Sequence, residues 1–229
     1  MKKNIIRIGL IITFFYGCNG SDECGYDVND CEEFCEVFED FEDDTVGSTG
    51  NNWLGISDNG ISIELRNGTN VLQAFDGSGA SWAYNTSDYI PNNFIDKGCE
   101  FNYDVEYDAV SGSNGATTDN GFTIFTGTSP SSNTSIATFL LNSSSLINSG
   151  ASPTTITVPL ELATGTTLPS NSMGQWILSG ASNPTTAVDV ANFNALIQNV
   201  DGIAFWLDEG MNPSEKWWFD NFCFKQCCP

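Results

Sequence analysis

The sequence predicts an all-β protein, an antiparallel β-sandwich with one short helix. Short runs of β-branched and aromatic residues recur along the chain, and clusters of Gly, Ser, Asn, Asp and Thr separate them. Such clusters favour turns, and about ten runs of this kind indicate a sandwich of two sheets. The sequence has no regular alternation of strand and helix patterns, which a parallel sheet would require.

The expected strands follow one another from residue 38 onward. Residues 38–42 alternate apolar and acidic side chains, which is typical of a strand with one buried face. The segments 61–65 and 71–75 flank Asn67-Gly68, which favours a turn. The longest alternation covers 99–107. Further strands are expected at 122–125, 136–141, 156–160, 175–178, 203–207 and 217–224.

One helix is expected near residues 189–200. Asp189 is a suitable capping residue, and Asp201-Gly202 ends the pattern. Between them, apolar side chains recur at helical spacing, at Phe193, Leu196, Ile197 and Val200. We expect this helix to close one end of the sandwich.

The first 17 residues have the pattern of a secretory signal. Three basic residues within positions 1–7 accompany an apolar run at 5–16, which is shorter than the ~20 residues that cross a bilayer. Phe15-Tyr16-Gly17-Cys18 resembles a bacterial lipobox, which implies that the Cys18 thiol carries a lipid. The alternative is an ordinary secreted protein in which Cys18 is removed or forms a disulfide.

The expected organisation has three parts: a lipoprotein signal peptide at 1–17, an acidic, cysteine-containing tether at 18–37, and a single β-sandwich domain at 38–229. A lipid on Cys18 would hold the protein at the cell outer membrane, exposed at the surface, and the lipid anchor would be its only membrane contact. Without the lipid, we expect a secreted protein.

The charge balance restricts the partners. The chain has 29 acidic residues against seven basic ones and a net charge of −22. This field repels phosphate groups, so nucleic acids and anionic lipid surfaces are excluded, whereas neutral glycans and divalent cations are not. The chain has no histidine, which excludes Ser-His-Asp and Cys-His catalysis and nearly all zinc sites. Hydrolysis by paired carboxylates does not need histidine.

The cysteines predict disulfides, because the chain is exported. If Cys18 is lipidated, seven are left: Cys24, Cys31, Cys35, Cys99, Cys223, Cys227 and Cys228. Most gather near the two ends of the mature chain, so we predict at least one bridge between the N-terminal arm and the C-terminal tail. An odd number leaves one thiol free or joins two molecules. A metal cluster is the less favoured alternative, because no histidine is available.

Three motifs together resemble carbohydrate-binding jelly rolls of the galactose-binding-like type. They are Asp40-Phe41-Glu42-Asp43 with Asn52-Trp53, the helix-to-strand unit at 193–205, and Trp218-Phe219-Asp220-Asn221-Phe222-Cys223-Phe224. The domain also resembles uncharacterised surface domains of Gram-negative bacteria. The resemblance implies a jelly-roll sandwich on a surface lipoprotein and, as its function, the binding of a glycan.

The resemblance also implies a structural calcium ion at Glu42 and Asp220. Strand alternation places Asp220 on one face with Trp218, Phe222 and Phe224, and we expect that face to be buried. A carboxylate on a core face needs a cation or several hydrogen bonds, and calcium binds hard oxygens. The alternative is that Asp220 accepts backbone N–H groups at a sheet corner without a metal.

A glycan site needs an aromatic ring for the apolar face of a sugar and polar groups for its hydroxyls. The candidate ligand-binding residues are Trp82, Tyr84, Trp206 and Trp217. Trp206 and Trp217 alternate with apolar neighbours expected in the core, so we expect both to point outward. For each of the four, packing in the core or anchoring a loop is the alternative role.

Three classes of function remain open. A non-catalytic glycan-binding module comes first, and a structural or adhesion subunit of a surface protein assembly, homomeric or heteromeric, comes second. A carboxylate-dependent hydrolase or lyase comes third, because the acidic residues are scattered and the sequence gives no pair separation. We therefore predict no catalytic residues.

Overall fold

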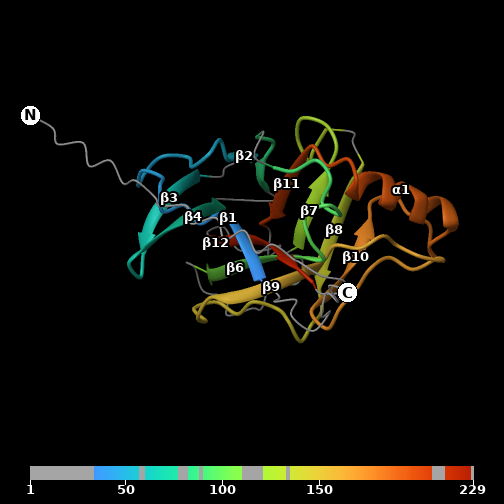
Figure 1. The fold of residues 1–229 in the computed structure, drawn as a ribbon. Coiled ribbons are helices and arrows are strands. Elements are labelled where there is room, and N and C mark those ends of the chain that lie inside the picture. Colours follow the sequence, from blue (N-terminus) through green and yellow to red (C-terminus); the bar gives the residue numbers. More distant parts are fainter. Residues whose placement is uncertain are drawn as a thin grey trace, which may run out of the picture. The chain divides into compact units, whose positions relative to one another are not determined.

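Two antiparallel sheets, each with six strands, form the protein. The computed structural model (Figure 1) describes residues 34–56, 60–76, 82–87, 90–109, 121–132, 135–207 and 215–227. All of them belong to one unit, Glu32–Pro229. The predicted signal peptide at 1–17 and residues Cys18, Cys24, Cys31 and Cys228 lie outside the described residues.

The first sheet has the strand order β3-β4-β12-β6-β9, and β1 pairs with β12. Its strands are β1 (Phe34–Glu39), β3 (Gly60–Arg66), β4 (Thr69–Asp76), β6 (Glu100–Ala109), β9 (Thr154–Pro159) and β12 (Glu215–Gln226). The second sheet has the order β10-β8-β7-β11-β5-β2. Its strands are β2 (Leu54–Ile56), β5 (Trp82–Asn85), β7 (Gly121–Phe125), β8 (Ile136–Leu141), β10 (Gly174–Leu178) and β11 (Gly202–Trp206).

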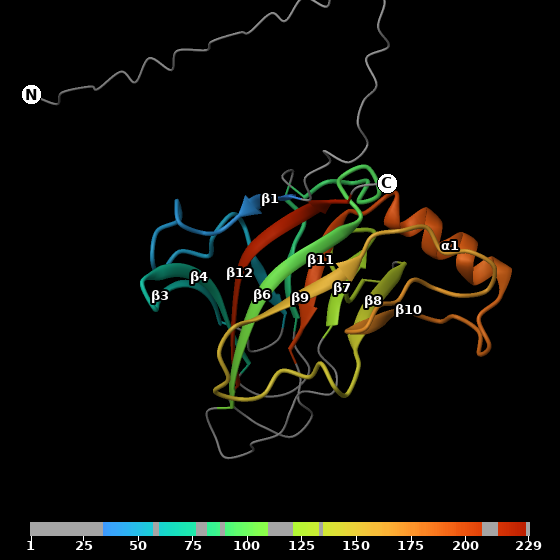
Figure 2. The ribbon, with the colours of Figure 1, turned by 60° about the horizontal axis from the view of Figure 1, so that its bottom comes forward.

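This architecture confirms the predicted antiparallel jelly-roll sandwich. The two sheets form two layers, and β12, β6 and β9 of the first lie side by side (Figure 2). Aromatic rings fill the space between the layers. Phe101 of β6 packs against Phe122 of β7 with ring centroids 4.5 Å apart, and Phe205 of β11 stacks on Phe219 of β12 at 4.1 Å. Each pair joins one sheet to the other, and burying each ring contributes roughly 1.5–3 kcal/mol.

A bulge in β12 separates two parts of this strand: the predicted faces are reversed before the bulge and correct after it, at Phe222 and Phe224. Asn221 has a φ of 54°, and the register with β6 shifts between Asp220 and Cys223. Asn tolerates this left-handed conformation better than most residues. Before the bulge, Trp217 and Phe219 point into the core, and after it Phe222 and Phe224 do so. Trp218 and Asp220 therefore lie on the outer face of the first sheet.

Two sequence predictions fail for this reason. Trp217 is 1% exposed and its ring lies 4.3 Å from that of Tyr107, so its predicted outward orientation is wrong. Asp220 does not share the core face with Phe222, because a strand that gains one residue at a bulge moves every later side chain to the opposite face. Trp218 is also buried, but beneath Arg66 on the outer face.

The helix α1 (Ala187–Ile197) lies beside the end of the second sheet that carries β8 and β10 (Figures 1 and 2). Thr186, rather than the predicted Asp189, is its N-cap, and the two form a reciprocal capping box. Phe193 packs against Trp176 of β10 with ring centroids 5.5 Å apart. The helix thus seals the core at this end. Within the described residues, none of the helical structure is long and apolar enough to cross a membrane.

The N-terminal arm joins the sandwich earlier than predicted. β1 begins at Phe34, within the segment assigned to the tether, because residues 34–39 pair with the end of β12. Cys35 is bonded to Cys223, and the Cα atoms are 5.5 Å apart. This confirms the predicted bridge between arm and tail. A second bridge joins Cys99 to Cys227, with Cα atoms 5.6 Å apart.

Candidate functional site

Two tryptophans meet on the outer face of the second sheet. Trp206 of β11 lies directly opposite Trp82 of β5, and Ala204 lies opposite Tyr84. The rings of Trp82 and Trp206 meet edge to face, with centroids 4.6 Å apart and planes at 65°. Their neighbours Ala83 and Phe205 point into the core, so strand alternation directs both indoles outward. Both side chains are partly exposed.

Apolar side chains extend this surface along the sheet in both directions. Leu54 of β2 pairs with Tyr84 and is 47% exposed, and on the opposite edge strand Ile177 of β10 is 40% exposed. A hollow of about 350 Å³ lies on this face, lined by Trp82, Thr138, Leu140, Ile177, Ser179 and Trp206. We call the outer surface formed by these six residues together with Leu54 and Tyr84 the aromatic platform.

Gly121 of β7 contributes no side chain to the platform between β11 and β8. It pairs with Leu140, and its neighbour Phe122 pairs with Phe205. A Cβ atom on Gly121 would come within 2.5 Å of the Thr138 side chain and 2.6 Å of the Phe139 carbonyl oxygen. Since the backbone of Phe139 cannot move away without disturbing the sheet, glycine is required at position 121. All five residues of β7 are buried, so side chains of the flanking strands β11 and β8 form the surface of the platform here.

A second hollow, of about 400 Å³, continues beyond the edge strand β10. Its residues come from β10 and from the loops on either side of it: Thr166, Thr167, Leu168, Ser170, Gln175, Trp176, Ile177, Leu178, Ala181, Ser182, Asn183 and Thr185. We call it the hydroxyl groove. Ile177 lines both the platform hollow and the groove, so the two are neighbours on the surface.

The outer face of the first sheet carries a different, charged arrangement. The Arg66 guanidinium lies 3.6 Å from the centre of the Trp218 ring and forms an ion pair with Glu106. The Trp218 indole N–H donates to the Glu64 carboxylate at 2.8 Å. Each of these groups thus has a partner, and Arg66 covers the ring that a sugar would need.

Asp220 lies next to this cluster, opposite Asp104 on β6. Burial, with smaller contributions from the negative charges of Asp104, Glu42 and Asp40, raises the pKa of Asp220 to about 6, while the N–H that Asn221 donates to it acts in the opposite direction. Glu42 accepts the backbone N–H of Asn70 at 3.0 Å. The two predicted calcium ligands therefore influence each other electrostatically.

These carboxylates only partly meet the needs of a calcium ion. Among the described residues, the group of three potential ligands whose atoms lie within 4.8 Å of one another is Cys99, Glu100 and Cys227. Two of those are joined in a disulfide and so are not metal ligands. Glu42 and Asp220 belong to no such group, so calcium binding would require their side chains to approach one another.

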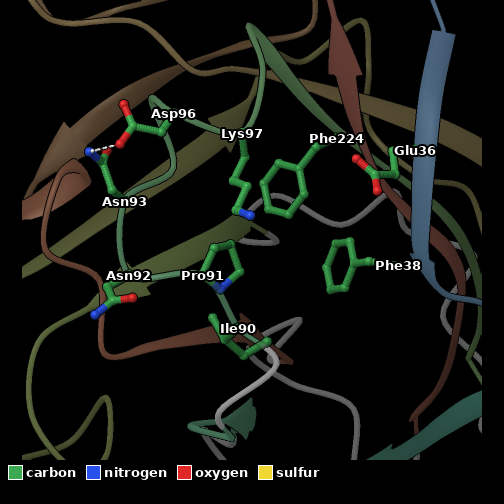
Figure 3. Close-up of a pocket in the computed structure, with 9 residues that line it drawn as sticks. All are labelled: Glu36, Phe38, Ile90, Pro91, Asn92, Asn93, Asp96, Lys97 and Phe224. Atoms are coloured by element: carbon green, nitrogen blue, oxygen red, sulfur yellow. Dashed lines mark hydrogen bonds between the residues drawn. The ribbon is translucent and has the colours of Figure 1, made fainter.

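A further pocket, of about 520 Å³, lies between β1, β12 and residues 90–97 (Figure 3). Phe38 stacks on Phe224 on one side, with centroids 5.0 Å apart. Glu36 and Lys97 reach toward the pocket from opposite walls, while Asp96 accepts a hydrogen bond from Asn93. We call it the stapled pocket because a disulfide lies near each wall. The Cys35–Cys223 bridge ties β1 to β12, and the Cys99–Cys227 bridge holds the start of β6, which follows residues 90–97 in the chain.

Of the four predicted ligand-binding residues, the structure brings three together. Trp82, Tyr84 and Trp206 share the platform, whereas the buried Trp217 offers no surface. Sequence analysis missed Leu54, Gly121 and Ile177. Ile177 had a signal: 175–178 alternates, and the apolar 176 and 178 positions, if buried, leave Ile177 facing outward.

Comparison with known proteins gives the fold. No protein-family model matches the chain, and no curated protein does. Part of an exo-β-agarase structure is similar, with a TM-score of 0.52 and 15% identity over 84% of this chain, which spans only 25% of that protein. A weaker likeness is to the family 11 carbohydrate-binding module of a Clostridium thermocellum cellulosomal cellulase, with a TM-score of 0.43 and 15% identity over 83% of this chain and 94% of that module. Another is to a family 30 carbohydrate-binding module, with a TM-score of 0.39 and 11% identity over 86% of this chain and 88% of that module. The agarase likeness supports the sandwich fold.

Proposed function

We propose that this chain is a non-catalytic glycan-binding β-sandwich and that the aromatic platform is its binding face. The observation that carries this proposal is the Trp82–Trp206 pair, two partly exposed indoles that meet 4.6 Å apart on one sheet face. The apolar face of a pyranose ring packs against aromatic rings, and neighbouring polar groups bind its hydroxyls. Thr138 and Ser179 supply hydroxyls within the same hollow.

The other aromatic surfaces suit a sugar less well. Arg66 covers the Trp218 ring, and Phe38 and Phe224 stack on each other. On the platform, by contrast, the two indoles meet edge to face at 65°, and both side chains are partly exposed. The likeness to part of an exo-β-agarase agrees with a carbohydrate ligand, although this chain spans only a quarter of that protein.

We infer no catalytic role, because the acidic side chains in the part of the chain that the structure describes do not form a cleft. Asp104 and Asp220 are neighbours on adjacent strands of one sheet face, rather than carboxylates facing each other across a substrate site. Asp104 also accepts hydrogen bonds from Thr155 and Asn221. No carboxylate among the described residues lines either hollow of the second sheet.

A structural or adhesion subunit of a surface assembly is the second candidate function. The observation in its favour is that Leu54 and Ile177 are both well exposed on the face that carries the tryptophans. Such an apolar surface also serves to bind proteins. The two functions differ in the partner that occupies the platform, and Trp206→Ala would weaken either.

Two further parts of the proposal concern ions and location. A structural calcium ion would be held by Glu42 and Asp220. Burial chiefly, and the charges of Asp104, Glu42 and Asp40 to a smaller extent, raise the pKa of Asp220, and a cation would offset both effects, which supports the site. A lipid on Cys18 would hold the protein at the outer membrane, and the Gly17-Cys18 pair behind the apolar run supports this. Labelling with a fatty-acid probe should mark the wild type and not Cys18→Ala.

A glycan array probed with the purified protein tests the main proposal. We expect binding to one class of glycan, with loss of at least about fivefold in affinity for Trp206→Ala or Trp82→Ala, because a central aromatic contributes about 1–3 kcal/mol. Lys97→Ala, in the stapled pocket, is the matched control and should bind like the wild type. Glycan binding that survives both tryptophan substitutions would contradict the proposed face.

A further inference from the structure

We infer that the binding surface does not end at the edge strand β10, but continues over Ile177 into the hydroxyl groove, and that its ligand is an extended chain of neutral sugars. This inference rests on the proposed function and adds to it the length and the charge of the ligand. The groove is a separate hollow from the aromatic platform, and Ile177 is the residue that lines both.

The continuity of the surface comes from the alternation of β10. Trp176 and Leu178 are buried, so Gln175 and Ile177 face outward. Gln175 pairs with Leu140 and Ile177 with Thr138, which places both next to the platform on β8. The same two residues line the groove on the other side. A ligand that lies on Trp206 and extends across β8 therefore reaches the groove without leaving the protein surface.

The dimensions favour a chain over a single sugar. From β5 to β10 the sheet order is β5-β11-β7-β8-β10. Neighbouring strands lie about 4.8 Å apart, so the path from Trp82 to Ile177 is on the order of 19 Å, and the groove lies beyond it. Such a path is several times the width of one pyranose ring. A lone terminal sugar would leave most of it unused.

Among the residues that the structure describes, neither hollow is lined by an ionisable side chain. This is unusual for a chain in which 16% of residues are charged. The stapled pocket, by comparison, contains Glu36, Asp96 and Lys97. A charged ligand on the platform would lose water without gaining an opposite charge, and an anionic one would also meet the field of a protein with a net charge of −22. A neutral, hydroxyl-rich ligand has neither cost.

The groove offers the polar groups that sugar hydroxyls need. Hydroxyl and amide side chains both donate and accept hydrogen bonds, and seven line it: Thr166, Thr167, Ser170, Gln175, Ser182, Asn183 and Thr185. Backbone hydrogen bonds hold its walls in place. The Trp176 N–H donates to the Pro169 carbonyl at 2.9 Å, and the Ser182 N–H donates to the Asp189 carboxylate at 3.3 Å. The groove is therefore formed before a ligand arrives.

Calorimetric titration with neutral oligosaccharides of increasing length tests the inference. The probes are cello-, laminari-, xylo- and agaro-oligosaccharides, with oligogalacturonates as the anionic counterpart. The variant Thr167→Ala/Gln175→Ala removes two exposed groove side chains that have no structural role visible in the hydrogen bonding. We expect it to weaken binding of the longest bound neutral oligosaccharide by about five- to tenfold and that of the shortest by less than twofold. Trp206→Ala should weaken both, and oligogalacturonates should not bind.

The outcomes separate the inference from the proposal on which it rests. Equal affinity for short and long oligosaccharides, together with an unaffected double variant, would overturn the extension into the groove and leave glycan binding intact. Preferential binding of oligogalacturonates would overturn the neutral ligand. If the protein binds none of the probes and no glycan on the array, both the inference and the proposed function are wrong. Lys97→Ala again serves as the control.

Discussion

Trp82 and Trp206 come from strands more than a hundred positions apart and yet meet edge to face, 4.6 Å apart, on the outer side of the second sheet. Antiparallel pairing of β5 with β11 places them directly opposite one another. Trp217, which has a similar sequence environment, lies instead in the core at 1% exposure. The two kinds of tryptophan should respond differently to substitution.

Trp206→Ala should weaken ligand binding while costing little stability, and Trp217→Ala should do the reverse. Removing a fully buried tryptophan leaves a cavity and costs about 3–5 kcal/mol of unfolding free energy. Removing the partly exposed Trp206 costs mainly its contact with Trp82, roughly 0.5–1.5 kcal/mol beyond the area it buries. Urea denaturation of both variants measures the difference. A larger loss of stability for Trp206→Ala would contradict the assignment of faces.

The two disulfides should stabilise the end of the sandwich where β1 joins. Cys35 and Cys223 are 188 residues apart, so their bond restricts the unfolded chain strongly. In the chain-entropy model, a loop of this length corresponds to roughly 4–5 kcal/mol. The variant Cys35→Ser/Cys223→Ser should therefore unfold at a lower urea concentration than the wild type. Both proteins are measured under non-oxidising conditions that leave the Cys99–Cys227 bridge intact. Peptide mapping without reduction should recover the linked pair from the wild type, and a Cys35 peptide linked elsewhere would contradict the structure.

Much of the fold could be predicted from the sequence because alternation and turn residues are local signals. The predicted strands at 61–65, 71–75 and 99–107 correspond to β3, β4 and β6. The faces of β12 could not be predicted in this way. They depend on the bulge at Asn221, which is one residue with a positive φ, and a shift of one position exchanges inward and outward side chains.

The candidate site could be predicted only in part, because a sheet face is assembled from distant segments. The sequence placed Trp82 with Tyr84, two residues apart on one strand, and pointed separately to Trp206. That Trp206 pairs with Trp82, or that Leu54 and Ile177 complete the surface, depends on the strand order of the second sheet. Long-range pairing of this kind leaves no local pattern. The segment 175–178 predicts a strand but not which strand it neighbours.

If calcium binds at Glu42 and Asp220, chelation should destabilise the protein. A ligand that binds only the folded state contributes about 2.7 kcal/mol at a hundredfold excess over its Kd. For a domain of this size, that corresponds to a shift in melting temperature of about 5–10 °C. Added calcium should restore the melting temperature after treatment with chelator, and Asp220→Asn should not respond. A melting curve that chelator leaves unchanged would contradict the metal and leave Asp220 as a carboxylate held by the Asn221 N–H.

In the presence of chelator, Asp220→Asn should raise the stability of the protein near neutral pH and not in acid. Burial, with smaller contributions from Asp104, Glu42 and Asp40, raises the pKa of Asp220 from 3.8 to about 6 in the folded state. Between these two values the folded protein binds more protons than the unfolded one, so the stability of the wild type falls as the pH rises from about 4 to 6. Above that range the charge is a constant cost, which we put at about 1 kcal/mol because the side chain is partly exposed and screened by solvent. Asparagine has no charge and keeps an oxygen that accepts the Asn221 N–H.

Urea denaturation of both proteins across pH 4–8 should therefore give curves that coincide at the acidic end and separate toward neutral pH. A variant less stable than the wild type at pH 7 would mean that the ionised carboxylate is favourable where it lies, as it would be beside a bound cation.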